Sequence, residues 1–385
     1  MSTLKVDGIR SNSATSDAIT LASDGTCTAN ITNNLSNRNL IINGAMQIAQ
    51  RGTTSTGVNV GCVDRMNQQY GGENEAPTFA QVDVASGTTP YTLGFRKAFK
   101  ITNGNQTSGA GTSDYMYVQT ILEGQDIANS GWNYLSASSY ITISYWIKSS
   151  VAQNFYGLIT SSDGTAQAYV WETGSLSADT WTKITKTIPG NSNLTFDNDN
   201  GAGMYFSPVR AFDGTARTGS MSLNSWAAYS GSARTPDQTS TWYTTNDATL
   251  EITGLQLEVG SVATDFEHRS FAQELQLCKR YYQQIDQASS STSIMTGFGN
   301  GNARIRGVVH LPVEMRANPT VALDTSAGSP GFYSYTASPP TYSSLSGVES
   351  TTENIVVDIN TSTVTAGAPY DWRGSGAFIT ISAEL

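Results

Sequence analysis

Charged residues are scarce in this chain of 385 residues: Asp, Glu, Lys and Arg make up 14% of it, against about 25% in an average soluble protein. Ser and Thr together supply about a quarter of the residues, so hydroxyl and amide groups must form most of the polar surface. The charges that are present are mainly acidic, with 31 Asp and Glu against 21 Lys and Arg. Because binding a polyanion over a broad face needs clustered cations, the composition disfavours nucleic acid as a partner.

Long apolar runs and cysteines are also few. No window approaches the ~18 consecutive apolar residues of a membrane helix, and residues 1–10 carry charges where a secretory signal needs an apolar core. We therefore expect a chain made in a cytoplasm that does not insert into a membrane. Cys27, Cys62 and Cys278 are spaced too widely for a disulfide framework or a zinc site, which predicts buried free thiols.

Short strand patterns, separated by turns rich in Gly, Asn, Asp and Ser, dominate what remains. Residues 140–148 alternate almost strictly, with Tyr145 and three isoleucines on one face and Trp146 on the other. Similar stretches cover residues 98–102, 115–121, 155–161, 166–171, 181–188, 204–209 and 248–257. This series predicts an all-β body, a jelly roll or similar β-sandwich, over residues 39–269.

One segment, residues 270–286, has a helical pattern instead. Ser270 and Gln273 fit a capping box, and the segment contains neither Gly nor Pro. Its apolar residues are spaced by four and three, at Phe271, Leu275, Cys278, Tyr282 and Ile285. Two interpretations stay open: a helix lying on the sandwich, or a short seam between identical chains.

Both ends of the chain have β patterns of their own. Strands at residues 303–312, 320–323, 354–359 and 377–382 predict a smaller C-terminal β-sandwich over 287–385, which begins with a polar linker at 287–293. At the other end, residues 18–29 predict a hairpin that turns at Asp24-Gly25. Because an isolated hairpin is marginally stable, we expect residues 1–38 to be an arm that attaches to other proteins.

Several runs resemble a known family of virion proteins. Residues 39–52 (NLIINGAMQIAQRG) and 181–188 (WTKITKTI) resemble a domain of tail fibres and related virion proteins of tailed bacteriophages, particularly phages of marine bacteria and cyanobacteria. The most specific run is 253–271 (TGLQLEVGSVATDFEHRSF). Residues 4–9 (LKVDGI) are similar to the virion-proximal start of many such proteins, and residues 311–319 resemble the segment C-terminal to the domain in them.

This resemblance implies a jelly roll of the carbohydrate-binding-module type in a homotrimer. Together with the N-terminal arm, the all-β body and the hydroxyl-rich surface, it leads us to expect a non-enzymatic tail fibre on the virion exterior. This fibre would anchor to other virion proteins through residues 1–38 and contact host-surface glycan by multivalent binding. The alternative is a baseplate, neck or capsid decoration protein that binds only other virion proteins. A more distant alternative is a hydrolase of surface polysaccharide.

Catalytic and metal patterns are weak. His268 and His310 are the only histidines, and neither accompanies a nucleophile motif, so we expect structural roles for both. The acidic run 197–201 suggests a calcium loop, but the glutamate that a twelve-residue loop needs would fall at Pro208. We expect a turn there and predict no cofactor, although calcium is common in jelly rolls of the carbohydrate-binding type.

Sugar binding asks for an exposed aromatic platform beside amides and hydroxyls, and the chain has 7 Trp and 18 Tyr. Trp146 projects from the face opposite its strand's isoleucines, Tyr169 and Trp171 share one face of theirs, and Trp132 lies in a loop-like run. These four residues are the predicted glycan platform, with Trp146 and Trp171 first. For each of them, a place in the core or in a subunit interface is the competing interpretation.

Overall fold

The computed structural model describes residues 6–21, 23, 27–29, 37–285, 293, 295–324, 330–334, 342–362, 364–374 and 378–385. Its first unit is a three-stranded sheet of β1 (Gly8–Ile9), β2 (Ile19–Leu21) and β3 (Cys27–Ala29), with β2 in the centre. The antiparallel β2–β3 pair is the predicted hairpin, while its predicted turn at Asp24-Gly25 lies outside the described residues. The sequence patterns did not predict β1 as a strand.

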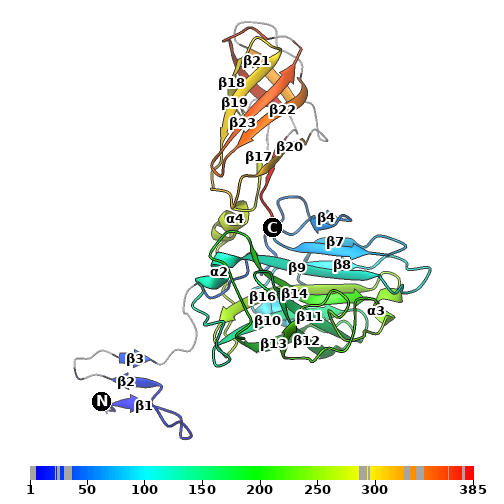
Figure 1. Ribbon diagram of the computed structural model, residues 1–385, viewed down its shortest axis with the longest axis vertical. Coiled ribbons are helices and arrows are strands. Elements are labelled where there is room, and N and C mark those ends of the chain that lie inside the picture. The colour runs from blue at the N-terminus through cyan, green and yellow to red at the C-terminus, as the bar shows by residue number, and fades with distance from the viewer. Residues whose placement is uncertain are drawn as a thin grey trace.

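Two antiparallel sheets form the jelly-roll body (Figure 1). The six-stranded sheet has the order β13-β10-β16-β8-β7-β4, and the seven-stranded sheet has the order β15-β12-β11-β14-β9-β6-β5. Their strands are β4 (Thr54–Ser55), β5 (Asn59–Val60), β6 (Asn67–Gly71), β7 (Thr78–Asp83), β8 (Lys97–Thr102), β9 (Tyr115–Glu123), β10 (Tyr140–Ser149), β11 (Asn154–Ser161), β12 (Gln167–Ser175), β13 (Thr182–Pro189), β14 (Ala202–Asp213), β15 (Trp226–Ala228) and β16 (Thr249–Val259). Each stretch predicted between residues 98 and 257 is a strand, whereas β4 to β7 and β15 were not predicted.

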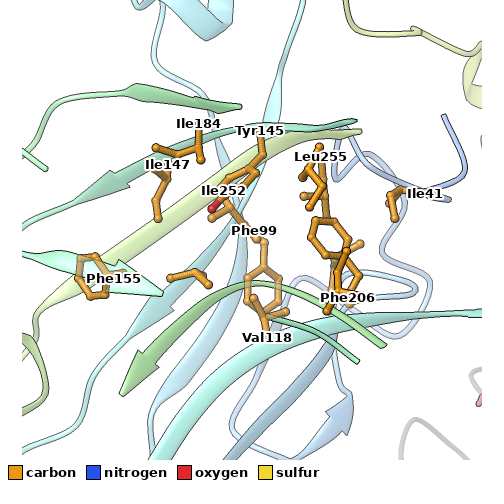
Figure 2. Packing of buried hydrophobic residues seen from close by; sticks show 14 of the residues in the cluster. Ile41, Phe99, Val118, Tyr145, Ile147, Phe155, Ile184, Phe206, Ile252 and Leu255 are labelled. Carbon is orange, nitrogen blue, oxygen red and sulfur yellow. The ribbon is translucent and has the colours of Figure 1, made fainter. Parts of the chain in front are cut away.

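The core lies between these two sheets and follows from the alternation of side chains along the strands. The isoleucines of β10 and Tyr145 are at most 1% exposed, which confirms the predicted buried face. Figure 2 shows Tyr145 and Ile147 on the side of the core opposite Phe155 and Phe206, which come from the other sheet. Gly157, which pairs with Trp171 across β11 and β12, leaves room for that side chain, because a Cβ atom at Gly157 would lie 2.1 Å from the indole ring.

Helices are few and short: α1 (Thr89–Thr92), α2 (Gly124–Ala128), α3 (Thr241–Thr244) and α4 (Phe271–Lys279). In the part of the chain that the structure describes, none of them is long and apolar enough to cross a membrane. The longest, α4, begins with the predicted capping box, in which the Ser270 hydroxyl accepts from the Gln273 amide and the Gln273 side chain accepts from Ser270.

The predicted helix over 270–286 is too long. Helix α4 ends at Lys279, and Tyr282–Ile285 forms β17, which pairs with β25 (Phe378–Ser382). The predicted apolar seam therefore does not exist, because Tyr282 and Ile285 belong to a strand and Phe271 is 60% exposed. Pairing with β25 has overridden the helix propensity of this segment. Its two consecutive tyrosines also favour a strand, because aromatic residues are enriched in strands.

The C-terminal unit is the predicted second sandwich. A three-stranded sheet, β17-β25-β20, faces a six-stranded sheet, β21-β24-β18-β19-β23-β22. The strands not yet given are β18 (Met295–Gly299), β19 (Arg304–His310), β20 (Thr320–Asp324), β21 (Pro330–Ser334), β22 (Tyr342–Ser350), β23 (Asn354–Thr361) and β24 (Pro369–Gly374). Side chains from both sheets, among them Ile305, Ile359 and Ile381, share one buried cluster. Apart from Ser293, the predicted linker at 287–293 lies outside the described residues.

A stacked ion cluster joins the two sandwiches, near the C-terminal end of the chain in Figure 1. Glu384 accepts hydrogen bonds from Arg51 and Arg65 of the jelly roll. Arg51 lies over the ring of Tyr282 at 3.5 Å, and Arg65 lies over the ring of Tyr281 at 3.4 Å. Cation–π contacts and charge-assisted hydrogen bonds thus act at the same junction.

A second contact lies beside the first, at the end of β9. Glu123 is fully buried and accepts bonds of 2.9 and 2.8 Å from the Nε and Nη2 atoms of Arg280, and a further bond from the Tyr281 hydroxyl. On the other side, the Ala383 amide donates to the Tyr281 carbonyl oxygen and the Arg316 amide to the Arg280 carbonyl oxygen, each at 2.8 Å. The segment after α4 is therefore held to both sandwiches by buried or half-buried polar groups.

Candidate functional site

Three of the four predicted platform aromatics are core residues. Trp171 is 0% exposed and donates from Nε1 to the Tyr145 hydroxyl at 3.2 Å, while Tyr169 and Trp132 are each 3% exposed. Tyr169 packs edge-on against Trp226, and Trp132 donates to the Ser139 carbonyl oxygen. The shared face of Tyr169 and Trp171 is the inner face of the sheet, so these three side chains cannot form an exposed platform.

Trp146 is the one predicted platform residue with an accessible side. It is half-buried on the outer face of the six-stranded sheet, where it packs near Phe95 and Phe266. Together with His268 and Lys183 it lines a cavity of about 210 Å³. The rings of Phe95, Phe266 and His268 pack against one another there.

The better-formed site lies on the outer face of the seven-stranded sheet. In β9, Met116 and Val118 point into the core, whereas Tyr117 and Gln119 are half-buried on the opposite face. Tyr205 has the same outward position in β14, between two buried neighbours. The alternation that builds the core therefore also places tyrosine and amide side chains on the outside.

These side chains line a groove of about 300 Å³, within the lower end of the size range of small-ligand sites. Strand β11 adds Leu158 and Thr160, and the loop after β15 adds Tyr229 and Arg234 as a wall. The full lining is Tyr117, Gln119, Leu158, Thr160, Ser161, Ser162, Ala166, Tyr205, Arg210, Tyr229 and Arg234. It combines aromatic faces, hydroxyls, one amide and two guanidinium groups.

The wall is fixed by main-chain hydrogen bonds. Strand β15 pairs with β12, and directly after it the Tyr229 amide donates to the Ala166 carbonyl oxygen at 2.9 Å. The Arg234 amide donates to the Arg217 carbonyl oxygen at 2.8 Å. Met221, from the connection before β15, packs against Leu158, Ala168 and Val170 on the outer face of β11 and β12.

A buried ion pair supports the groove floor. Arg210 donates from Nη2 to Asp213 at 2.7 Å, and the two side chains are 3% and 0% exposed. Burial lowers the pKa of Arg210, but Asp213 outweighs that effect and keeps the pKa above its usual value. Arg210 therefore stays charged, and its guanidinium lies over the ring of Tyr117 at 3.9 Å.

A larger cavity, about 690 Å³, lies beside α2 and α4. Its lining includes Asn39, Gln125, Asn129 and Leu277 but no aromatic side chain. Its apolar side chains, Leu40, Ile42 and Leu277, are aliphatic and give a sugar ring no flat aromatic face to pack against. The smaller groove on the seven-stranded sheet thus has the better chemistry for a ligand that is both apolar and polar.

The 197–201 run and the two histidines make structural contacts. Asp199 closes the 197–201 turn by accepting from the Gly201 amide, and the described residues hold no cluster of three or more side chains that could bind a metal. His268 contacts the Leu93 carbonyl oxygen at 2.9 Å, and His310 contacts Asn354 across β19 and β23.

The cysteine prediction is confirmed for two of the three thiols. Cys62 and Cys278 are buried and free, and burial raises the pKa of Cys62 to about 11, so its thiol stays protonated. The side chain of Cys27 lies outside the described part of the structure.

Comparison with known proteins gives no family: no family model matches the chain, and no curated protein matches it. Among solved structures, the enzymatically active domain of tailspike protein 4 from bacteriophage CBA120 is 9% identical, with a TM-score of 0.31; the match covers 57% of this chain and 21% of that one. The family 11 carbohydrate-binding module of Lic26A-Cel5E from Clostridium thermocellum is 16% identical, with a TM-score of 0.25, over 56% of this chain and 98% of that one.

A third structure covers more of the chain. The tandem CBM22-1 and CBM22-2 domain of Xyn10C from Paenibacillus barcinonensis is 8% identical, with a TM-score of 0.27, over 91% of this chain and 99% of that one. At such TM-scores these likenesses do not assign a ligand, so the function must be inferred from the residues of the groove.

Proposed function

We propose that this chain is a non-enzymatic structural protein of a tailed-phage virion, a homotrimeric tail fibre that binds glycan on the host surface. The observation that carries glycan binding is the groove on the seven-stranded sheet. Tyr117 and Tyr205 offer ring faces there, with Gln119 and Thr160 beside them. A sugar ring has apolar C–H faces and a rim of hydroxyls, so it can pack on the rings while its hydroxyls bond to the amide and hydroxyl groups.

The lining favours binding over cleavage. Glycosidases use a pair of carboxyl groups placed on either side of the scissile bond. Of the residues that line the groove, none is Asp or Glu. The groove thus offers hydrogen-bond donors and aromatic contact surface, but no acid and base for hydrolysis.

The virion part of the proposal rests on the family-like runs at residues 39–52 and 253–271. Residues 1–38 would attach the fibre to other virion proteins, and the jelly roll would lie on the virion exterior. A 300 Å³ groove holds only a small part of a glycan. Three copies on one fibre would compensate, because the second and third contacts form at high effective concentration.

A glycan panel tests the binding proposal. Purified full-length chain should bind one or more immobilised bacterial surface polysaccharides, and Tyr205→Ala should weaken that binding by about tenfold. The matched control is Tyr140→Ala, which removes a tyrosine that is 36% exposed on the six-stranded sheet. A panel without any binding, or equal loss in both variants, would refute the groove as the glycan site.

Labelling of the particle tests the virion proposal separately. A label on the N-terminal arm should lie at the tail, with the C-terminal sandwich pointing outward, and the mass in solution should be that of three chains. A label flush on the capsid would favour the decoration-protein alternative. If the chain were a monomer at micromolar concentration, three sites could not act together, and binding by avidity would be ruled out.

A further inference from the structure

The charges around the groove indicate which ligands it favours. The chain as a whole has an excess of carboxylates and a formal net charge of −10. Yet the groove lining holds two arginines, Arg210 and Arg234, and neither Asp nor Glu. Asp213 neutralises the charge of Arg210, so the net positive charge of the groove lining comes from Arg234.

The guanidinium of Arg234 has unused capacity for ion pairs and hydrogen bonds. Among the described residues its guanidinium forms no ion pair within 4.0 Å, and its Nε atom is buried with no hydrogen-bond partner. A buried donor without an acceptor costs free energy, and the cost is larger for a charged group. The Nη groups of the same guanidinium remain to pair with an anionic oxygen that a ligand brings into the groove.

Building on the proposed glycan-binding role, we propose that the groove selects an acidic sugar residue, whose carboxylate or sulfate group accepts hydrogen bonds from Arg234. The planar guanidinium matches two oxygens of such a group at once, which adds direction as well as strength. The sugar ring then packs toward Tyr117 and Tyr205, with Tyr229 at the edge. A neutral sugar makes the same ring contacts but brings no negative charge to the Arg234 guanidinium.

Matched pairs of glycans test this selectivity in the full-length chain. The probes are oligogalacturonides and their methyl esters, which differ in the carboxylate, and sulfated and desulfated galactan oligosaccharides, which differ in the sulfate. We expect calorimetric affinity to be about tenfold or more higher for the acidic member of at least one pair. The pair that shows the difference identifies whether carboxylate or sulfate is the recognised group.

Substitution of Arg234 assigns the preference to this residue. Arg234→Gln should reduce the ratio of acidic to neutral affinity by about tenfold. Arg234→Lys keeps the positive charge but loses the planar group that binds two oxygens at once, so it should reduce the ratio less. Arg304→Gln removes one exposed positive charge from β19 of the C-terminal sandwich and should leave the ratio as it is.

Several outcomes would overturn the inference. Equal affinity for both members of every pair, or a preference that survives Arg234→Gln, would show that Arg234 selects no anion, while glycan binding as such would stand. Binding that Tyr205→Ala leaves unchanged would instead refute the proposed groove. Absence of binding to every probe would contradict the acidic-sugar proposal outright, and the surface-polysaccharide panel would then decide whether glycan binding itself survives.

Discussion

The guanidinium of Arg210 lies 3.9 Å from the centre of the Tyr117 ring, at paired positions of β14 and β9. Asp213 accepts hydrogen bonds from the Nε and Nη2 atoms of that guanidinium, and both charges are buried. The ring of Tyr117 is thereby fixed between the sheet and the groove before any ligand arrives. A rigid aromatic contact surface lowers the entropy cost of binding.

Removal of this ring should weaken glycan binding. Tyr117→Ala loses the contact surface while the Arg210–Asp213 pair remains, so we expect an affinity loss of about tenfold, or about 1.4 kcal/mol. Calorimetric titration with the glycan selected from the panel measures it, with Tyr140→Ala as the control. An unchanged affinity would mean that the tyrosine face is not used.

Trp171 should matter for stability and not through ligand contact. Trp171→Ala leaves a cavity in the jelly-roll core and removes the hydrogen bond to the Tyr145 hydroxyl, so the free energy of unfolding should fall by about 3–5 kcal/mol. Leu135→Ala, at a position that is 53% exposed, should change it little. Chemical denaturation measures both variants, and a loss below about 1 kcal/mol for Trp171→Ala would contradict the core assignment.

The structure shows how far the sequence determines the fold. Local alternation predicts the long strands, because one buried face per strand is visible in residues 115–121 or 140–148 alone. Strand β6 (Asn67–Gly71) shows no such alternation, since it is made mainly of amide side chains, and only pairing with β9 reveals it. Strand β17 was missed because its partner β25 lies far along the chain, at Phe378–Ser382.

The groove was harder to predict than the fold. Its tyrosines come from β9, β14 and the loop after β15, which only long-range pairing brings together. One signal was present: Tyr117 and Gln119 alternate with Met116 and Val118, which marks an outward polar face. Tryptophan was a misleading guide, because its large apolar surface favours the core.

Acid should weaken the contact that joins the two sandwiches. Burial raises the pKa of Glu123, but hydrogen bonds from Arg280 and Tyr281 outweigh it, so that pKa lies below its usual value of about 4.3. A carboxyl group with a lowered folded-state pKa stabilises the fold above the unfolded-state pKa and loses that contribution as the pH falls through the folded-state value.

Comparing the wild-type protein with the Glu123→Gln variant isolates the contribution of this carboxyl group. Wild type should lose more free energy of unfolding than Glu123→Gln between about pH 7 and pH 3, because the variant has no proton to take up at this position. Thermal or denaturant unfolding across that range measures both. Parallel curves for the two proteins would show that Glu123 does not carry the acid sensitivity.

Glu384 should hold the C-terminal sandwich against the jelly roll. Glu384→Ala leaves Arg51 and Arg65 without their shared carboxylate, and hydrogen bonds to charged groups contribute about 1.5–3 kcal/mol each. We expect faster proteolysis of the segment after α4 and a larger radius of gyration in solution scattering. Asp83→Ala breaks a surface pair whose carboxylate is 82% exposed and should cost less than about 1 kcal/mol. Equal effects of the two substitutions would contradict the role of Glu384.

Hydrogen exchange with and without a bound glycan tests the central claim most directly, since it reports which strands the ligand covers. With the glycan that binds best in the panel, we predict slower exchange in β9, β11, β14 and the loop that carries Tyr229 and Arg234, and no change in β10 or β13. Protection centred on the six-stranded sheet around Trp146, or no protection in the seven-stranded sheet, would contradict the account.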